Sequence, residues 1–233
     1  MNDKSMSLAF WVKFFENLLS MGINQLHVSR DYESYKLLCA VLNELDKNNI
    51  KKKFNFTVKL PEPDFADLTF ETERFQNKIE NYLEDLKVDK IYNVQWMWRS
   101  GLEKDDIRIN LFKKTLSRIN KVVNNCKTNK KLQNFYCFPY SLDFAKSNSE
   151  IFDGYVVYYN PSETNFFHFM KNFSNKKRII TIRPFYGGKL VNKGKLSISD
   201  LLDFQFKHKF IDGIIYTCTK KNHIYELARY FND

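Results

Sequence analysis

Apolar positions along the chain alternate between short runs typical of buried strands and longer stripes typical of amphipathic helices. Predicted helices cover residues 7–21, 33–45, 70–86, 106–123, a short segment from 142, 166–173, 199–206 and 222–231. Predicted strands cover residues 23–28, 54–58, 91–96, 135–138, 155–159, 179–182 and 214–217. The pattern therefore predicts seven strand-then-helix units that follow an unpaired first helix.

This strict alternation indicates a parallel sheet, because parallel neighbours need a crossover connection that is usually a helix. The length suits an α/β fold of the (β/α)8 TIM-type barrel class, in one domain over residues 1–233. An open doubly wound sheet is the alternative. Since no clear strand precedes the first helix, either the barrel has seven strands or residues 4–8 contribute a shortened first one.

The composition limits the class of protein. A hydrophobic fraction of 43% is ample for a large core, and no apolar run approaches the roughly 20 residues of a membrane span. The first residues lack the basic-then-apolar order of a secretory signal, so we expect a cytoplasmic protein. Since the cysteines and histidines show no metal-ligand spacing, we expect no metal site.

The net charge of +10 raises nucleic acid as a partner. However, the basic clusters fall directly before predicted strands, at residues 51–53, 130–131, 176–178 and 207–209. In a barrel, helices end at that face, and their dipoles favour cations there. We therefore interpret the clusters as structural and expect no nucleic-acid partner.

Barrels build their reactive sites at the carboxyl ends of strands. His27 and Tyr32 lie at and after the end of the first predicted strand, Lys59 follows the second and Gln95 lies at the end of the third. The other strand ends are aromatic, with Trp96, Trp98, Tyr140, Tyr158, Tyr159, Phe185 and Tyr186. Such side chains could stack on a sugar or a base, or they could fill the barrel mouth.

Several of these segments resemble those of the aldo-keto reductases, in the same order along the chain. Residues 22–32, from Gly-Ile-Asn to Tyr32, resemble the family's G-I-N-x-x-D-T-A-x-x-Y segment, and Lys59 resembles its paired lysine. Residues 158–161, 183–190 and 217–223 resemble its P-Y-N segment, glycine-bearing loop and cofactor-phosphate turn. The resemblance implies a barrel that reduces a carbonyl or sugar-type substrate with NADPH.

The resemblance also implies roles for single residues. Tyr32 would protonate the substrate carbonyl, Lys59 would lower the pKa of the phenol, and Gln95 would donate a hydrogen bond to the carbonyl oxygen. His27, the fourth catalytic candidate, stands where the family has an aspartate. The residues implied in cofactor binding are Asn160, Gly187, Gly188, Lys189, Thr219, Lys220 and Lys221.

Other positions depart from the family. Gln95 replaces its histidine and cannot relay a proton. Phe138-Pro139 and Val156 replace the groups that hold the nicotinamide amide, so we expect weak or absent NADPH binding.

Two functions stay open from the sequence. One is an atypical reductase, in which Asp31, Glu62 or Asp64 would have to replace the missing aspartate beside Lys59. The other is a catalytically inactive barrel, a pseudoenzyme, that binds a sugar or phosphate ligand or a partner protein.

Overall fold

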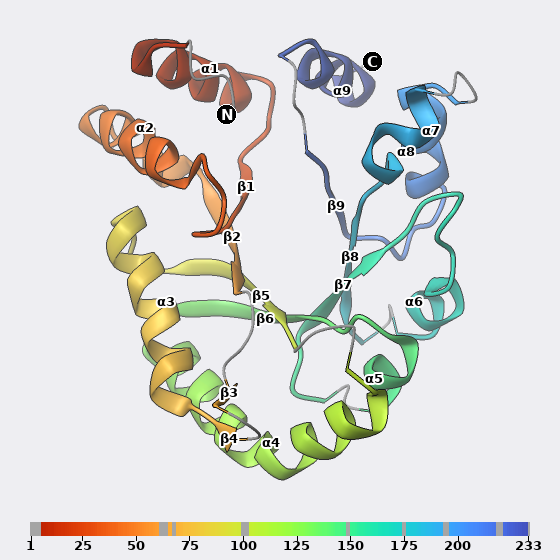
Figure 1. The fold of residues 1–233 in the computed structure, drawn as a ribbon. Helices are drawn as coiled ribbons and strands as arrows, with labels where there is room; N and C mark the ends of the chain where they lie inside the picture. The colour runs from red at the N-terminus through yellow and green to blue at the C-terminus, as the bar shows by residue number, and fades with distance from the viewer. Residues whose placement is uncertain are drawn as a thin grey trace. The chain divides into compact units, whose positions relative to one another are not determined.

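The computed structural model describes residues 6–60, 65–66, 69–98, 103–147, 150–173, 176–192, 196–217 and 221–232. The helices are α1 (Leu8–Ser20), α2 (Tyr35–Lys47), α3 (Thr72–Leu86), α4 (Asp105–Thr128), α5 (Leu142–Ser147), α6 (Phe167–Phe173), α7 (Lys189–Asn192), α8 (Ile198–Phe206) and α9 (Lys221–Asn232). The strands are β1 (Gln25–Val28), β2 (Asn55–Leu60), β3 (Phe65–Ala66), β4 (Thr69–Phe70), β5 (Ile91–Met97), β6 (Leu132–Phe138), β7 (Gly154–Tyr158), β8 (Arg178–Ile182) and β9 (Gly213–Ile215) (Figure 1). Two 3-10 turns, η1 (Lys51–Lys53) and η2 (Tyr186–Gly188), complete the described elements.

Seven strands form one sheet in the order β1-β2-β5-β6-β7-β8-β9, and the pairs β1–β2, β2–β5, β6–β7, β7–β8 and β8–β9 are parallel. Helices connect consecutive strands of this sheet, so the predicted alternation is confirmed. The doubly wound alternative is wrong, because the strand order follows the chain order without the reversal of that class. The short antiparallel pair β3–β4 was not predicted.

Residues 6–8, the part of the 4–8 segment that the structure describes, do not form a strand. The side chain of Ser7 accepts a hydrogen bond from the backbone N–H of Phe10 at 3.2 Å, and Leu8 is the first residue of α1. A serine in this position satisfies one of the free N–H groups of a helix start. Lys4 and Ser5 lie outside the described residues.

The chain divides into two compact units, which are described separately. The first comprises residues 1–99 and 110–135, and the second comprises residues 100–109 and 136–233. Both α4 and β6 run from one unit into the other. The prediction of one domain over residues 1–233 stays a prediction.

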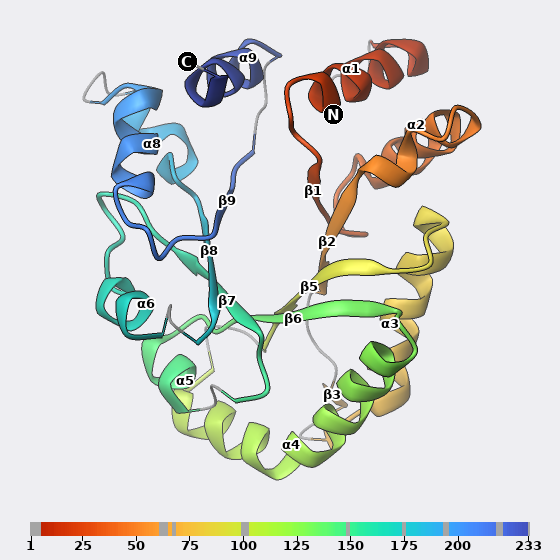
Figure 2. The same cartoon turned by 180° about the vertical axis from the view of Figure 1, so that it is seen from behind.

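In the first unit, the sheet has an apolar face and a polar face, since successive strand residues point to opposite sides. The ring of Trp96 on β5 lies 5.3 Å from that of Phe75 on α3 and 6.5 Å from that of Phe112 on α4. Both helices lie on the same side of β5 and β6 in Figures 1 and 2. Asn93 and Gln95 lie on the opposite face of β5 from Trp96, and Thr57 on β2 shares that face.

This alternation corrects one expectation about the strand-end aromatic residues. Trp96 and Trp98 are 1% and 0% exposed, in the core against the helices, and do not lie at a strand-end rim. Tyr159 is buried as well, at 2% exposure. The sequence position alone gives the height of a residue along the strand but not its face.

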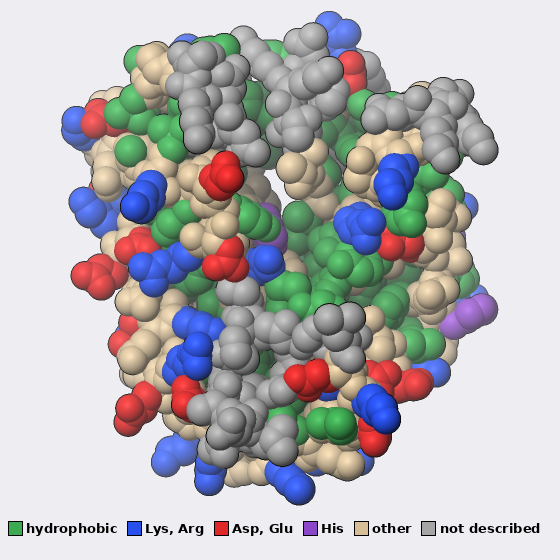
Figure 3. All heavy atoms as spheres, in the orientation of Figure 1, with side chains coloured by type: hydrophobic (Ala, Val, Ile, Leu, Met, Phe, Trp, Pro, Cys, Tyr) green, Lys and Arg blue, Asp and Glu red, His purple; other side chains and the backbone are tan. Residues whose placement is uncertain are grey.

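The lysine clusters precede strands, as predicted, and several of the lysines have structural partners. Lys51 is buried, and its Nζ donates to the carbonyl of Lys87 at the end of α3 at 2.8 Å. Lys131 pairs with Glu80 at 2.8 Å. On the face in Figure 3, the described Lys and Arg side chains lie among Asp and Glu side chains. These contacts support the structural interpretation of the clusters.

Gly154 opens β7 in the second unit, where two other strands leave no room for a side chain. A Cβ at this position would lie 2.4 Å from the carbonyl oxygen of Arg178 and 2.9 Å from the ring of Tyr136. The first of these neighbours is backbone and cannot turn aside.

We expect Gly154→Ala to lower the free energy of unfolding by about 2 kcal/mol, because overpacking forces the backbone to shift. Urea denaturation followed by circular dichroism measures the change. Gly213→Ala on β9 is the matched control, since nothing lies within 4 Å of its added Cβ. Equal losses in the two variants would contradict the packing argument.

None of the described helices is long and apolar enough to cross a membrane.

Candidate functional site

The four catalytic candidates meet in the first unit. His27 lies on β1, Lys59 on β2 and Gln95 on β5, while Tyr32 lies in the loop after β1. The register pairs His27 with Thr57 and Lys59 with Gln95, so the strand residues share the polar face of the sheet. The parallel order brings the carboxyl ends of β1, β2 and β5 together, as a strand-end site requires.

Hydrogen bonds connect three of these side chains, which we call the triad of Tyr32, His27 and Gln95. His27 Nε2 lies 2.8 Å from Gln95 Oε1, which can only accept, so Nε2 carries a proton and donates it. His27 Nδ1 lies 3.4 Å from the hydroxyl of Tyr32. Because a neutral imidazole has one N–H, Nδ1 accepts and the Tyr32 hydroxyl donates.

The electrostatics keep both ring systems of the triad neutral. Burial lowers the pKa of His27 to about 4, the hydrogen bond to Gln95 opposes this shift, and the nearby charge of Lys59 adds to it. Burial, together with the carboxylate of Asp31, raises the pKa of Tyr32 above its usual value. This direction is opposite to the lowering that the family resemblance implies.

Lys59 lies over the ring of Tyr32 and not at its hydroxyl. The Nζ atom is 5.7 Å from the ring centroid, within the range of a cation–π interaction. Among the described residues, no carboxylate pairs with this ammonium group. Glu62 and Asp64, two of the expected partners, lie outside the described residues.

Tyr82 on α3 fixes the backbone on both sides of the triad, and the sequence did not identify it. Its hydroxyl donates to the carbonyl of Lys59 at 2.9 Å and accepts from the backbone N–H of Arg30 at 2.8 Å. The end of β2 is thereby tied to the loop that carries Tyr32. In the sequence, Tyr82 is only one more residue on the apolar stripe of a predicted helix.

A second polar row crosses the same face of the sheet, two residues earlier along β5. Asn93 Nδ2 donates to Thr57 Oγ1 at 3.0 Å, and Asn134 Nδ2 donates to Asn93 Oδ1 at 2.9 Å. Thr57, Asn93 and Gln95 are 6%, 4% and 3% exposed. The alternation of polar and apolar residues in β5 is the sequence signal that could have identified this row.

The candidates for cofactor binding lie in the second unit. The side chain of Asn160 is fully buried, and it donates to Glu163 at 2.7 Å and to the carbonyl of Arg183 at 3.0 Å. Its Oδ1 accepts from the backbone N–H of Ser162 at 2.9 Å. This amide therefore holds the loop after β7, and each of its polar atoms has a partner.

The glycine-bearing loop forms η2 and leads into α7. Gly187 and Gly188 have φ angles of 64° and 82°, in the left-handed region that glycine adopts without strain. Lys189 is exposed, with its Nζ 5.4 Å from the ring centroid of Tyr186. Thr219 and Lys220 lie outside the described residues, as does the side chain of Lys221, the first residue of α9.

The positions that hold the nicotinamide amide in the family are apolar and filled. Phe138 and Val156 are 2% and 0% exposed. The ring of Phe138 lies 4.8 Å from that of Tyr140 and 5.0 Å from that of Tyr158. The described residues therefore do not fit a nicotinamide amide. At the glycine-bearing turn the backbone N–H of Gly187 could face a phosphate, whereas those of Gly188 and Lys189 donate to carbonyls within the turn.

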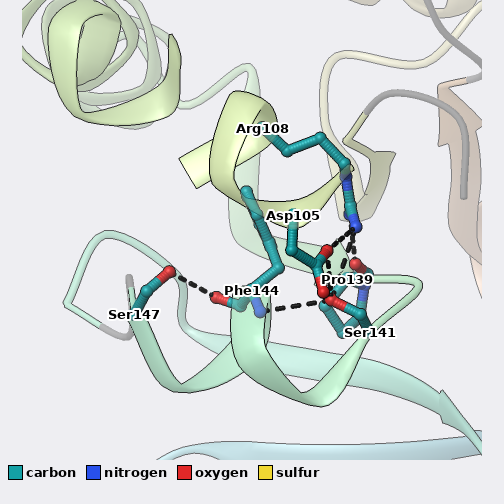
Figure 4. A network of polar contacts seen from close by, with 6 residues as sticks. All are labelled: Asp105, Arg108, Pro139, Ser141, Phe144 and Ser147. Carbon is teal, nitrogen blue, oxygen red and sulfur yellow. Dashed lines mark hydrogen bonds and ion pairs between the residues drawn. The ribbon is translucent and has the colours of Figure 1, made fainter. Parts of the chain in front are cut away.

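A buried arginine in the second unit was not predicted (Figure 4). Arg108 in the first turn of α4 is 1% exposed, and its Nη1 lies 2.7 Å from Asp105 Oδ1. Nη2 donates to the carbonyl of Pro139, and the hydroxyl of Ser141 donates to Asp105 at 2.7 Å. The network ties the start of α4 to the loop after β6.

The structure shows no gathering of three His, Cys, Asp or Glu side chains that could bind a metal ion within the described parts of the chain.

No family model and no curated protein matches this sequence. Solved structures do match it. A protein of Pseudomonas aeruginosa assigned as an aldo-keto reductase has a TM-score of 0.73 at 15% identity, over 97% of this chain and 85% of that chain. The holo form of an aldo-keto reductase from Bacillus halodurans has a TM-score of 0.67 at 11% identity, over 98% and 83%.

A third structure, assigned as a 2,5-diketo-D-gluconic acid reductase B, has a TM-score of 0.64 at 12% identity, over 98% of this chain and 79% of that chain. At identities this low, the similarity shows a shared fold and nothing more. The chain has the (β/α)8 TIM-type barrel fold of the aldo-keto reductases, and the predicted fold class is confirmed.

Proposed function

We propose that this chain is an atypical aldo-keto-reductase-like oxidoreductase that acts on a carbonyl or sugar-type substrate at the triad. The observation that carries the proposal is an ammonium group over the ring of a phenol, at the carboxyl ends of the neighbouring parallel strands β1 and β2 in this fold. Tyr32 is 41% exposed, so a substrate can reach it. A cytoplasmic protein with a small-molecule substrate and weak use of NADPH is part of the proposal.

The protein's own residues supply the proton half of such a reaction. Tyr32 exchanges a proton with the substrate oxygen, and Lys59 stabilises the negative charge that the phenol acquires when it releases its proton. Gln95 and His27 hold the Tyr32 hydroxyl through the hydrogen bonds of the triad. A nicotinamide cofactor, when bound, would supply the hydride.

Binding of that cofactor would depend on its phosphates. The backbone N–H of Gly187 and the ammonium group of Lys189 would meet a phosphate, whereas Phe138 and Val156 offer nothing to the amide. Since hydride transfer needs the nicotinamide ring held firmly against the substrate, we expect low turnover.

A second candidate function is a catalytically inactive barrel that binds a sugar or phosphate ligand or a partner protein. The buried Phe138 and Val156 favour it, as does the raised pKa of Tyr32. In that case the polar face would bind its ligand without chemistry.

We expect Tyr32→Phe to lower NADPH-dependent reduction of glyceraldehyde about 100-fold, because the variant lacks the hydroxyl that exchanges a proton with the substrate oxygen. The assay follows NADPH absorbance, and calorimetry measures NADPH affinity, which we expect to be unchanged in the variant. Tyr225→Phe, on α9, is the matched control and is expected to keep the wild-type rate. Equal non-zero rates in the wild type and in Tyr32→Phe would remove Tyr32 from the mechanism, whereas no reduction by the wild type would reject the reductase and favour the binding protein.

A further inference from the structure

The direction of the hydrogen bonds in the triad decides what the Tyr32 hydroxyl can offer a ligand. A phenol has one proton to donate and lone pairs to accept with. In the structure, Gln95 Oε1 accepts a hydrogen bond from the N–H of His27 Nε2, with 2.8 Å between the two heavy atoms. A neutral ring with its proton on Nε2 has a lone pair on Nδ1. The Tyr32 proton then points to Nδ1 at 3.4 Å, and the oxygen of Tyr32 presents lone pairs to the solvent.

We infer that Gln95, acting through His27, makes the Tyr32 hydroxyl a hydrogen-bond acceptor, so that the site binds its ligand through a hydroxyl group, as in a polyol or sugar, and not through a carbonyl oxygen. The inference rests on the proposed function for the location of the site, and it names the ligand class: the alcohol member of the carbonyl–alcohol pair. In it, Gln95 and His27 are positioning residues.

Lys59 supports the same ligand class. Its ammonium group carries three protons, lies over the Tyr32 ring and pairs with no carboxylate among the described residues. A hydroxyl group can donate its proton to Tyr32 and accept one from Lys59. A carbonyl oxygen only accepts, so in this arrangement it would find a donor in Lys59 alone.

The charges around His27 maintain this arrangement. The lone pair on Nδ1 exists only in the neutral ring, and both burial and the charge of Lys59 disfavour protonation. Asp31, the other charged group near Tyr32, disfavours loss of the phenol proton. A neutral phenol that donates to a neutral imidazole is therefore the stable state near pH 7.

The opposite arrangement would leave a different signature. If the Gln95 amide were turned so that its NH2 faced Nε2, His27 would carry its proton on Nδ1 and donate it to Tyr32. The Tyr32 hydroxyl would then be free to donate to a carbonyl. The two arrangements differ in which nitrogen of His27 carries the proton, and this can be measured without any ligand.

The first experiment is ¹⁵N–¹H correlation of the histidine rings at pH 7, with His27 assigned by the signals lost in His27→Gln. We expect the Nε2–H tautomer in the wild type. In Gln95→Glu, where a carboxylate replaces the amide, we expect both nitrogens to carry protons. The signals of His208 serve as the internal control and should not change. An Nδ1–H tautomer in the wild type would overturn the inference.

The second experiment compares two ligands of matched shape, cyclohexanol and cyclohexanone, titrated against the His27 signals. We expect cyclohexanol to bind about five- to tenfold more tightly, as one additional hydrogen bond allows. The difference should vanish in Tyr32→Phe and shrink in Gln95→Met, which no longer fixes the tautomer. Equal or tighter binding of the ketone by the wild type would overturn the inference.

These results are independent of the reductase assay with glyceraldehyde. Preference for the alcohol without any turnover would retain the inference and reject the proposed oxidoreductase. Turnover together with preference for the ketone would do the reverse.

Discussion

Replacement of Asp105 by alanine is expected to lower the free energy of unfolding by about 3–5 kcal/mol, because it leaves a buried guanidinium without its countercharge. Arg108 is 1% exposed, and Asp105 lies 2.7 Å from its Nη1. Burial lowers the pKa of Arg108, and the charge of Asp105 opposes that shift. Urea denaturation followed by circular dichroism measures the loss.

Two further variants separate the charge from the packing. Arg108→Met removes the buried charge together with the need for its partner, so we expect a smaller loss than in Asp105→Ala. Ser141→Ala removes one neutral hydroxyl and should cost about 1 kcal/mol. If Asp105→Ala cost no more than Arg108→Met, the ion pair would not be what stabilises the loop after β6.

The order of strands and helices followed from the sequence because each strand buries one side against a helix. The predicted strand at 91–96 and helix at 70–86 correspond to β5 and α3, which meet through Trp96 and Phe75. The pair β3–β4 and the helix α7 could not be predicted in this way, since elements of two and four residues are too short to show a period.

The meeting of Tyr32, Lys59 and Gln95 could also be predicted, because neighbouring parallel strands end at the same edge. What the sequence could not provide was the direction of each contact. Lys59 lies over the ring of Tyr32, and the hydroxyl of Tyr32 turns to His27. Both details depend on side-chain geometry within a few ångströms, which no residue pattern encodes.

Arg108 illustrates a different limit. A charged residue in the first turn of a helix is usually solvated, and in sequence Arg108 differs in no way from such a residue. It is buried because the loop after β6, more than 30 residues later, brings the carbonyl of Pro139 to its Nη2. Burial of this kind follows only from tertiary structure.

Acidification from pH 6.5 to pH 4 is expected to destabilise the protein, in part through His27. Its pKa is lowered from 6.5 to about 4 in the folded protein, mainly by burial. Between these values the unfolded chain binds a proton that the folded chain does not, so stability rises with pH in this window and falls as the pH drops through it. The shift corresponds to about 2–3 kcal/mol after allowance for the partial exposure of the ring.

Carboxylates titrate in the same range, so the contribution of His27 has to be isolated by difference. Urea denaturation at pH values from 4 to 7.5 gives the free energy of unfolding of the wild type and of His27→Gln. We expect the variant to lose about 2–3 kcal/mol less than the wild type on acidification, because it has no proton to bind. His168→Gln, at an exposed position on α6, is the matched control and should follow the wild-type curve closely. Parallel curves for the wild type and His27→Gln would show that the surroundings do not keep His27 neutral. They would also reject the inference that a lone pair on its Nδ1 orients the Tyr32 hydroxyl.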